Sequence, residues 1–410
     1  MKALKLAVVL FCTVGLVLLV NYPTPVTGQA GATEAPTGFD NRTADNIGTF
    51  ANQATHDADL ETFAERDEID DGLGPVYNAQ ACSECHQNPV VGAISQVTEV
   101  RAGHFTGITF VAHPGGTLIN DRAIDASIQE RVLAGNEVRT FRTSLNTLGD
   151  GFIEAIDSNT LQAIANAQPA GQRGTLLQVP VLEAPGQNRT GRFGWKCQHA
   201  SLLSFSGDAY INEIGITNRL IRVENTSNGN SVAAFDTVPD PAPSGEDSEN
   251  DIDIFARFMR ATKAPPRDAS ATSADAVAGS TLFDAVGCNI CHTRNITTAP
   301  AGTVINGGQF VVPAFLGNKI IHPFSDLIMH DVGTGDGIVQ EGMAQSTRNQ
   351  LRTPPLWGVR TRGRLMHDGD TLNRNEAILR HGGQATAVIN NYIGLSDTNK
   401  ARLIAFLNSL

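Results

Sequence analysis

The chain has 410 residues, of which 41% are hydrophobic and 6% are aromatic, and its formal net charge is −12. This length and hydrophobic content allow two or three domains with a sizeable core. The negative charge argues against nucleic acid and against an anionic membrane surface as partners.

The first 30 residues have the pattern of a targeting segment. Lys2 and Lys5 form a basic start, Leu6–Val20 is apolar and uncharged, and Gly28–Ala30 offers a small-residue cleavage site. The apolar run is shorter than the roughly 20 residues of a spanning helix. We therefore predict a signal peptide over 1–30 and a mature chain in the periplasm or otherwise exported, without a transmembrane span. An uncleaved N-terminal anchor is the alternative.

Polar, irregular chain precedes the first cysteine motif of the mature sequence. Residues 31–72 are rich in Gly and Asp, and Cys82–His86 follows soon after them. Beyond this motif, apolar residues from Ile124 to Val132 recur at every fourth position and predict a short helix over 123–135.

A loop and a helix stand between the two halves of the chain. Residues 224–250 are rich in Asn, Ser, Asp, Pro and Gly and predict a long surface loop. Apolar residues from Ile252 to Met259 share one face and predict a helix over 251–262. The run Ala264–Arg267 contains two prolines, which break the helix and mark a linker.

The C-terminal part carries its own pattern of helices. Leu282 and Phe283 predict a short helix that runs into a second cysteine motif, Cys288–His292. Near the end of the chain, Ser396 is expected to be the N-cap of a closing helix. The apolar face of that helix is formed by Leu403, Ile404, Leu407 and Leu410.

Two C-x-x-C-H motifs are the most specific signal in the sequence. They are Cys82 and Cys85 before His86, and Cys288 and Cys291 before His292. Two thiols three residues apart can reach the two vinyl groups of one haem, and the adjacent His then lies under the iron as its proximal ligand. A redox disulfide does not explain the His after both pairs, and zinc fits a cytosolic chain better than an exported one. We therefore predict two covalently bound haem c groups.

The helices around these motifs predict the fold class. A first helix that feeds the haem motif and a last helix that can cross it are how a small cytochrome c domain is built. We predict a mainly α chain with two cytochrome c-like haem domains. The N-terminal haem domain spans 31–263 and is elaborated by a long irregular insertion, and the C-terminal cytochrome c-like domain spans 264–410.

Eight short blocks carry a family resemblance. They are Gly72–Asn78, Gly191–Lys196, Ser201–Leu203, Glu213–Thr217, Asp326–Gly333, Arg352–Gly358, His367–Gly369 and Ala377–Gly383. With these blocks the sequence resembles the di-haem oxidoreductase family, which is related to bacterial di-haem cytochrome c peroxidases and to MauG. The resemblance implies a peroxidase-like enzyme that takes electrons from a small redox protein at the C-terminal haem and reduces peroxide at the N-terminal haem. The alternatives are a non-enzymatic electron-transfer cytochrome and a MauG-like enzyme that oxidises a partner protein.

The second axial ligand decides whether a haem iron carries electrons or binds peroxide. In the relatives that the resemblance names, the ligand of the C-terminal haem is a Met or Tyr after the His-Asp-Gly block, and His381 stands at that place here. Rival ligands are His367, Met366, His330 and Met343. For the N-terminal haem, either His104 or His113 is the second axial ligand of the iron, or this ligand position is open.

Three further residues are expected at the site. An open iron needs a distal acid or base, and a weak repeat between Phe141–Leu145 and Leu351–Leu356 suggests that Glu154 lies near that face; the alternative is a solvent-facing glutamate. The resemblance implies that Trp195 passes electrons between the haems, with core packing as the alternative. Arg352 is the first of several C-terminal arginines expected to neutralise haem propionates.

Two acidic clusters and one spare cysteine complete the candidates. Eight acids between Asp57 and Asp71 form the first cluster, and five between Glu246 and Asp253 form the second. They are interpreted as solvated loops, as a docking face for a basic electron donor, or as a Ca²⁺ site. Cys197 is expected to be a buried small hydrophobe.

Overall fold

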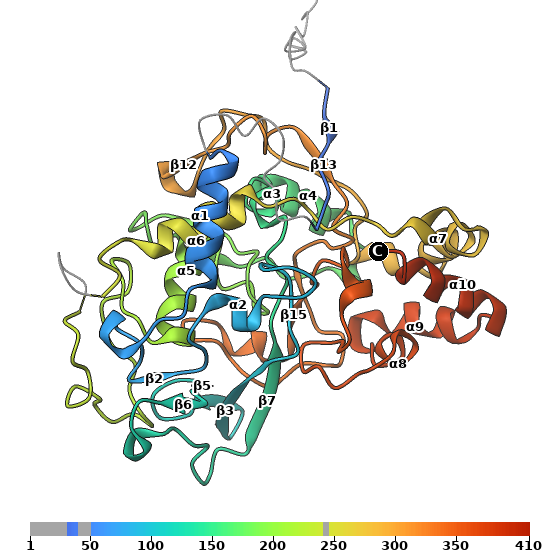
Figure 1. The fold of residues 1–410 in the computed structure, drawn as a ribbon. Helices are drawn as coiled ribbons and strands as arrows, with labels where there is room; N and C mark the ends of the chain where they lie inside the picture. The colour runs from blue at the N-terminus through green and yellow to red at the C-terminus, as the bar shows by residue number, and fades with distance from the viewer. Residues whose placement is uncertain (1–30, 40–50, 241–245) are drawn as a thin grey trace, which may run out of the picture. The chain divides into compact units, whose positions relative to one another are not determined.

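Helices and several small sheets share the fold (Figure 1). The computed structural model describes residues 31–39, 51–240 and 246–410, so the predicted signal peptide over 1–30 lies outside the described residues. The structure is 34% helical and 16% strand. The prediction of a mainly α chain is therefore wrong. Strands β1 to β9 lie within 31–263, the predicted N-terminal haem domain.

The main sheet is formed by the segment 98–143. Its strands are β3 (Thr98–Thr106), β4 (Thr109–Ala112), β5 (Leu118–Ile119) and β7 (Val138–Thr143). All three partners run antiparallel to β3. The sequence did not reveal this sheet because β3 lacks a clean alternation of polar and apolar residues: three consecutive positions, Arg101 to Gly103, are buried.

The remaining strands form short ladders of two or three strands. They are β1 (Thr33–Glu34) with β13 (Lys319–Ile321) and β10 (Ile296–Thr297); β2 (Val76–Tyr77) with β6 (Arg122–Ala123); β8 (Gln178–Pro180) with β9 (Asn188–Thr190); β11 (Val304–Ile305) with β12 (Phe310–Val311); and β14 (Met329–His330) with β15 (Leu351–Arg352). Because β6 takes Arg122–Ala123 and only a 3-10 turn follows at Ala126–Ile128, the helix predicted over 123–135 is wrong.

Helices from distant parts of the chain share one apolar core with the cysteines of the first motif. They are α1 (Gln53–Ala64), α2 (Cys82–Cys85), α3 (Asp150–Glu154), α4 (Ser158–Ala167), α5 (Leu202–Ala209) and α6 (Asp251–Ala261). Helix α1 packs against α2 and α6, and α5 packs against α6. The helix predicted over 251–262 is thus confirmed, and its buried face joins Phe63 of α1 in the larger apolar core.

Helices α7 to α10 enclose the second motif. They are α7 (Ala274–Val286), α8 (Arg374–Leu379), α9 (Thr386–Ile393) and α10 (Asp397–Leu407). Both predicted helices are confirmed, and the Ser396 side chain accepts the backbone N–H of Asn399 as an N-cap. Helices α7 and α10 cross at Gly279, where a Cβ would lie 1.9 Å from the Arg402 carbonyl oxygen. Gly287 ends α7 with φ of 102°, so the chain turns directly into Cys288.

Two further findings concern the organisation of the chain. Residues 32–410 form one compact unit, within which the boundary predicted at 263/264 stays a prediction. Within the described ranges, no helix is both long and apolar enough to cross a membrane.

Candidate functional site

The two cysteine motifs hold their histidines in the same way. Nδ1 of His86 lies 3.1 Å from the Ala93 carbonyl oxygen, and Nδ1 of His292 lies 2.9 Å from that of Phe324. Since a carbonyl only accepts, Nδ1 carries the proton in both rings, and Nε2 keeps a lone pair for a metal. A backbone carbonyl that accepts from Nδ1 and so fixes the ring in this tautomer is typical of metal-ligating histidines.

A phenylalanine stands beside each of these imidazoles. The ring centroid of Phe63 lies 6.3 Å from that of His86 at an interplanar angle of 61°. The ring centroid of Phe283 lies 6.2 Å from that of His292 at 57°. Phe63 comes from α1 and Phe283 from α7, so the two surroundings are built alike from different parts of the chain.

The protonation and thiol states fit haem attachment at both motifs. Cys82, Cys85, Cys288 and Cys291 are free thiols, as thioether formation with vinyl groups requires. Burial lowers the pKa of His86, and burial together with the nearby His381 lowers that of His292 to about 4. Both imidazoles are therefore neutral at neutral pH, which is the form that binds iron.

A cavity opens beside the second motif. Its lining includes residues of both halves: Ile94, Leu145, Trp195, Cys288, Cys291, His292, His330, Arg352, Trp357, Arg362, Met366, His367, Arg374 and His381. Four imidazoles thus face the same space. Of the predicted residues, Cys288, Cys291, His292, His381, Trp195 and Arg352 are brought together here.

His381 repeats the arrangement of the motif histidines. It follows α8, and its Nδ1 lies 2.8 Å from the Ala377 carbonyl oxygen, which leaves Nε2 free. Burial lowers the pKa of His381, so this ring is also neutral. It shares the cavity with His292, and its role as the second ligand of the C-terminal haem stays a prediction.

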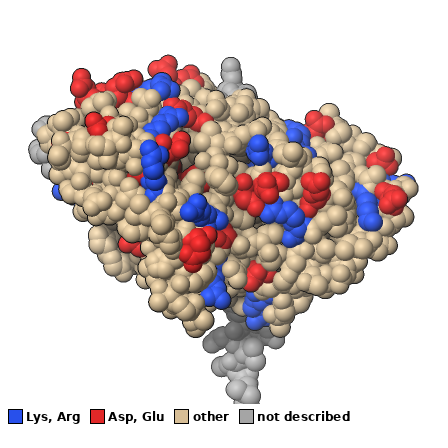
Figure 2. Space-filling view, turned by 90° about the horizontal axis from the view of Figure 1, so that it is seen from below, with Lys and Arg blue, Asp and Glu red and all other residues tan. Residues whose placement is uncertain are grey.

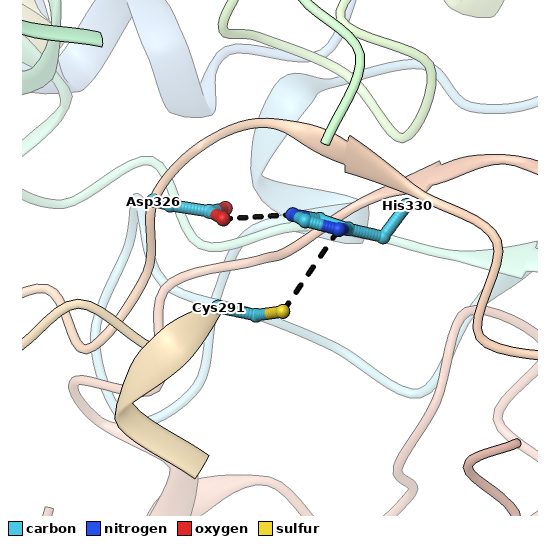
Figure 3. A group of neighbouring side chains, drawn as sticks. All are labelled: Cys291, Asp326 and His330. Atoms are coloured by element: carbon cyan, nitrogen blue, oxygen red, sulfur yellow. Dashed lines mark hydrogen bonds and ion pairs between the residues drawn. The ribbon is translucent and has the colours of Figure 1, made fainter. Parts of the chain in front are cut away.

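His330 differs from its neighbours in charge. Its Nε2 lies 2.7 Å from Oδ2 of Asp326, and its Nδ1 lies 3.8 Å from Sγ of Cys291 (Figure 3). Burial lowers its pKa, but the interactions with Asp326 and Cys291 together raise it to about 10. The ring is therefore protonated, which disfavours it as an iron ligand. Sequence reasoning missed Asp326, although the spacing of four residues between the two was visible.

The other rival ligands have different surroundings. His367 is 4% exposed, its Nε2 lies 3.4 Å from Oγ1 of Thr140, and its Nδ1 has no partner among the described residues. Met366 also lines the cavity. Met343 packs instead with Phe110 and Ile338, in a separate small apolar cluster.

Trp195 lies at the junction of the two halves. Its Nε1 donates to the Thr143 carbonyl oxygen at 2.8 Å, and its ring centroid lies 6.2 Å from that of His367. Next to it, the fully buried Lys196 pairs with Asp336 at 2.8 Å, and Asp336 also pairs with Arg142 at 2.7 Å. This buried triad fixes the backbone that carries Trp195.

Arg352 and Cys197 lie close to Trp195. Nε of Arg352 donates to the Gly194 carbonyl oxygen at 2.8 Å. The backbone N–H of Arg352 donates to the carbonyl oxygen of Trp195. The carboxylates of Asp150 and Asp326 stand near this guanidinium. Cys197 is 2% exposed, as predicted, and burial raises its thiol pKa to about 12.

The histidines proposed for the first motif are engaged elsewhere. Nδ1 of His104 lies 3.2 Å from Oδ1 of Asn136, and Nε2 of His113 accepts the backbone N–H of Leu133 at 3.2 Å. His104 is on β3, and His113 directly follows β4.

Glu154 is fully buried and belongs to a network of hydrogen bonds. Its carboxylate pairs with Arg260 at 2.6 Å and accepts from the backbone N–H of Leu202 and from Nδ2 of Asn306. Arg260 is the main cause that lowers the Glu154 pKa, against the effect of burial. The structure therefore places it in a buried ion pair rather than facing solvent, and an acid-base role stays a prediction.

Acidic side chains group on the N-terminal half. Glu246 of the second predicted cluster lies with Glu224 and Asp240, each offering an oxygen within 4.8 Å of the others. Burial and nearby acids raise the pKa of Glu224 to about 9. Figure 2 shows acidic and basic side chains interspersed on one face, without a continuous basic area there. The calcium site stays a prediction.

The comparisons with known proteins agree with the cysteine and histidine side chains of the site. Residues 119–410 match the sequence model of a family described as "Di-haem oxidoreductase, putative peroxidase". The match includes the second cysteine motif and begins after the first. No curated protein matches the chain significantly.

Two solved structures resemble the chain at 14% identity. One is a hydrazine synthase of Kuenenia stuttgartiensis, solved under xenon pressure, which matches over 94% of this chain and 98% of its own with a TM-score of 0.40. The other is a MauG-like protein associated with microbial copper homeostasis, which matches over 95% of each chain with a TM-score of 0.41.

Proposed function

We propose that this chain, which belongs to the di-haem oxidoreductase family, is a peroxidase-like enzyme with two covalently bound haem c groups. Cys82, Cys85 and His86 would hold the N-terminal haem. Cys288, Cys291 and His292 would hold the C-terminal haem. The haems would supply the redox chemistry: electrons from a small redox protein would enter at the C-terminal haem, and two electrons and two protons would convert one hydrogen peroxide to two waters at the N-terminal haem.

One observation carries the division of labour between the two sites. His292 and His381 share a cavity, and each has its Nδ1 on a carbonyl and its Nε2 free. Two neutral imidazoles suit a six-coordinate iron, which transfers electrons. By contrast, Nε2 of His113 accepts the backbone N–H of Leu133, and neither His113 nor His104 lines the cavity, which extends to Ile94 and Leu145. We therefore propose an iron with an open position at the first motif.

We also propose that the protein is exported. The basic start and apolar run of residues 1–30 have the pattern of a signal peptide, and we propose that the mature chain acts in the periplasm or another exported compartment. The net charge of −12 favours a basic redox protein as the electron donor.

The experiment compares the purified di-haem protein with His381→Ala. We expect a high-spin and a low-spin ferric signal in the electron paramagnetic resonance spectrum, and turnover of peroxide with a reduced small redox protein. His381→Ala should convert the low-spin signal to high-spin, because the second ligand of the C-terminal iron is lost. The matched control is His322→Ala, whose exposed ring pairs with Glu34 and Asn295.

Three outcomes would contradict the proposal. Low-spin, six-coordinate spectra from both haems in both redox states would indicate an electron carrier without peroxidase activity. Oxidation of a partner protein in place of peroxide turnover would indicate a MauG-like reaction. The mass of the bare polypeptide, after production in a host that attaches haem c, would rule out covalent haem altogether.

A further inference from the structure

Two guanidinium groups that line the cavity, those of Arg362 and Arg374, have no acidic partner among the residues that the structure describes. We propose that Arg362 binds a propionate of the N-terminal haem and that Arg374 binds a propionate of the C-terminal haem. The inference rests on the proposed function, because it requires haem at both motifs. It names cofactor-binding residues outside the cysteine motifs and replaces Arg352 as the first choice.

Arg374 begins α8 and has an unused buried donor. One of its terminal nitrogens donates to the Val359 carbonyl oxygen at 2.9 Å. Its Nε is buried without a hydrogen-bond partner among the described residues. A buried N–H without an acceptor costs about 1–3 kcal/mol, and more for a charged group. An anionic ligand in the cavity would remove this cost.

Arg362 lies on the side of the first motif. Its Nε donates to the Arg364 carbonyl oxygen at 2.9 Å, and its NH2 group contacts Thr143 and Ser144. Oγ of Ser144 accepts the backbone N–H of Ser95 at 3.0 Å, and Ser95 lies two residues after Ala93, whose carbonyl oxygen holds Nδ1 of His86. The guanidinium also lies 5.8 Å from the ring centroid of Trp195. This position between Trp195 and the His86 loop assigns Arg362 to the N-terminal haem.

The charge balance separates these two arginines from Arg352. Burial alone lowers the pKa of Arg362, to about 10, and burial alone lowers that of Arg374. For Arg352, in contrast, the nearby Asp326 counteracts burial. Arg352 therefore already has a counter-charge, whereas Arg362 and Arg374 have none among the described residues.

Haem propionates can supply the negative charge and the hydrogen-bond acceptors that Arg362 and Arg374 lack. Each haem carries two carboxylates, and a guanidinium pairs with a carboxylate through parallel hydrogen bonds. A buried cation is stable when it is paired and hydrogen-bonded. The cavity already contains His292 and the cysteines of the second motif, so a bound haem there would bring its carboxylates to the same space.

The test measures the reduction potential of each haem in Arg362→Gln and Arg374→Gln. The double variant C82S/C85S, which keeps only the C-terminal haem, assigns the potentials. Removing a positive charge near the iron favours the oxidised form. We expect the ratio of oxidised to reduced haem at a fixed potential to rise about tenfold, which for a one-electron couple is a fall of about 59 mV. Arg374→Gln should shift the C-terminal haem, and Arg362→Gln the N-terminal haem.

Two further variants distinguish charge from packing. Arg374→Lys and Arg362→Lys keep the positive charge and should recover most of the potential. The matched control is Arg402→Gln, whose side chain on α10 is 42% exposed and pairs with the exposed Asp275. If the glutamine variants bind both haems yet have the potentials of this control, the inference is wrong. If wild-type protein carries no haem, the proposed function fails instead.

Discussion

The surroundings of His86 and of His292 are alike in detail but assembled differently. Each imidazole donates from Nδ1 to a backbone carbonyl, and each stands beside a phenylalanine ring at a similar distance and angle. Around His292, the packed helices α7 and α10 lie in one stretch of about 135 residues from 274 to 407. Around His86, α1 and α6 are separated by the main sheet and by several loops.

This difference in assembly bears on which side chains surround each motif histidine. A contiguous segment brings His381 into the cavity of His292. The interrupted half instead engages His104 and His113 with Asn136 and Leu133 around the main sheet. We therefore expect two different coordination environments around the same local unit, because the chain around each motif decides which histidines lie near it.

The largest expected effect comes from removing the thiols of one motif at a time. Cys82→Ser/Cys85→Ser should leave one covalent haem and abolish peroxide turnover, since the open iron is lost. Cys288→Ser/Cys291→Ser should also leave one covalent haem but abolish electron entry from the redox protein. Intact mass and the spectrum of the remaining haem check both. Peroxide turnover that survives in Cys82→Ser/Cys85→Ser would break the proposed division of labour.

The variant Glu154→Gln tests whether Glu154 on the N-terminal side is a structural ion-pair partner or a catalytic acid-base group. Removing one partner of a buried ion pair leaves Arg260 uncompensated and should lower the free energy of unfolding by about 3–5 kcal/mol. Denaturant unfolding of the haem-loaded protein measures this. The double variant Glu154→Gln/Arg260→Met removes both charges and should recover part of the loss. Unchanged stability with lost peroxide turnover would instead support the predicted acid-base role.

The smallest expected effect concerns Glu224, in the acidic group of the N-terminal half. Burial raises its pKa from 4.5 to about 9, so the folded protein favours the protonated form. Its contribution to stability is complete below pH 4.5 and is lost as the pH rises toward 9. Glu224→Gln should therefore stabilise the protein at pH 8, by roughly 1 kcal/mol after solvent screening.

The pH dependence and a cation test this last prediction. The advantage of Glu224→Gln should shrink toward pH 5, and added Ca²⁺ should reverse it if the three carboxylates bind the ion. Exposed Glu249→Gln in the neighbouring segment is the control. A stabilisation that does not vary with pH would show that ionisation of Glu224 is not its cause.

The sequence revealed the second motif and its helices because their signals are local. Ser396 as a cap, the apolar pair Leu282–Phe283 before Cys288 and the apolar face of α10 each depend on residues a few positions apart. The main sheet was missed because β3 pairs with three strands and buries consecutive residues, so its alternation is masked. The partner of Glu154 was missed because Arg260 lies 106 residues away. Long-range charge pairing leaves no spacing pattern.

The buried triad of Arg142, Lys196 and Asp336 has a consequence for dividing this protein. A fragment that begins at residue 264 would keep Asp336 and lose both of its cations, while the complementary fragment would keep two cations without their acid. Each piece would then carry buried charge without compensation, which costs several kcal/mol per ion. Neither half is expected to be a stable stand-alone cytochrome, whatever its haem content.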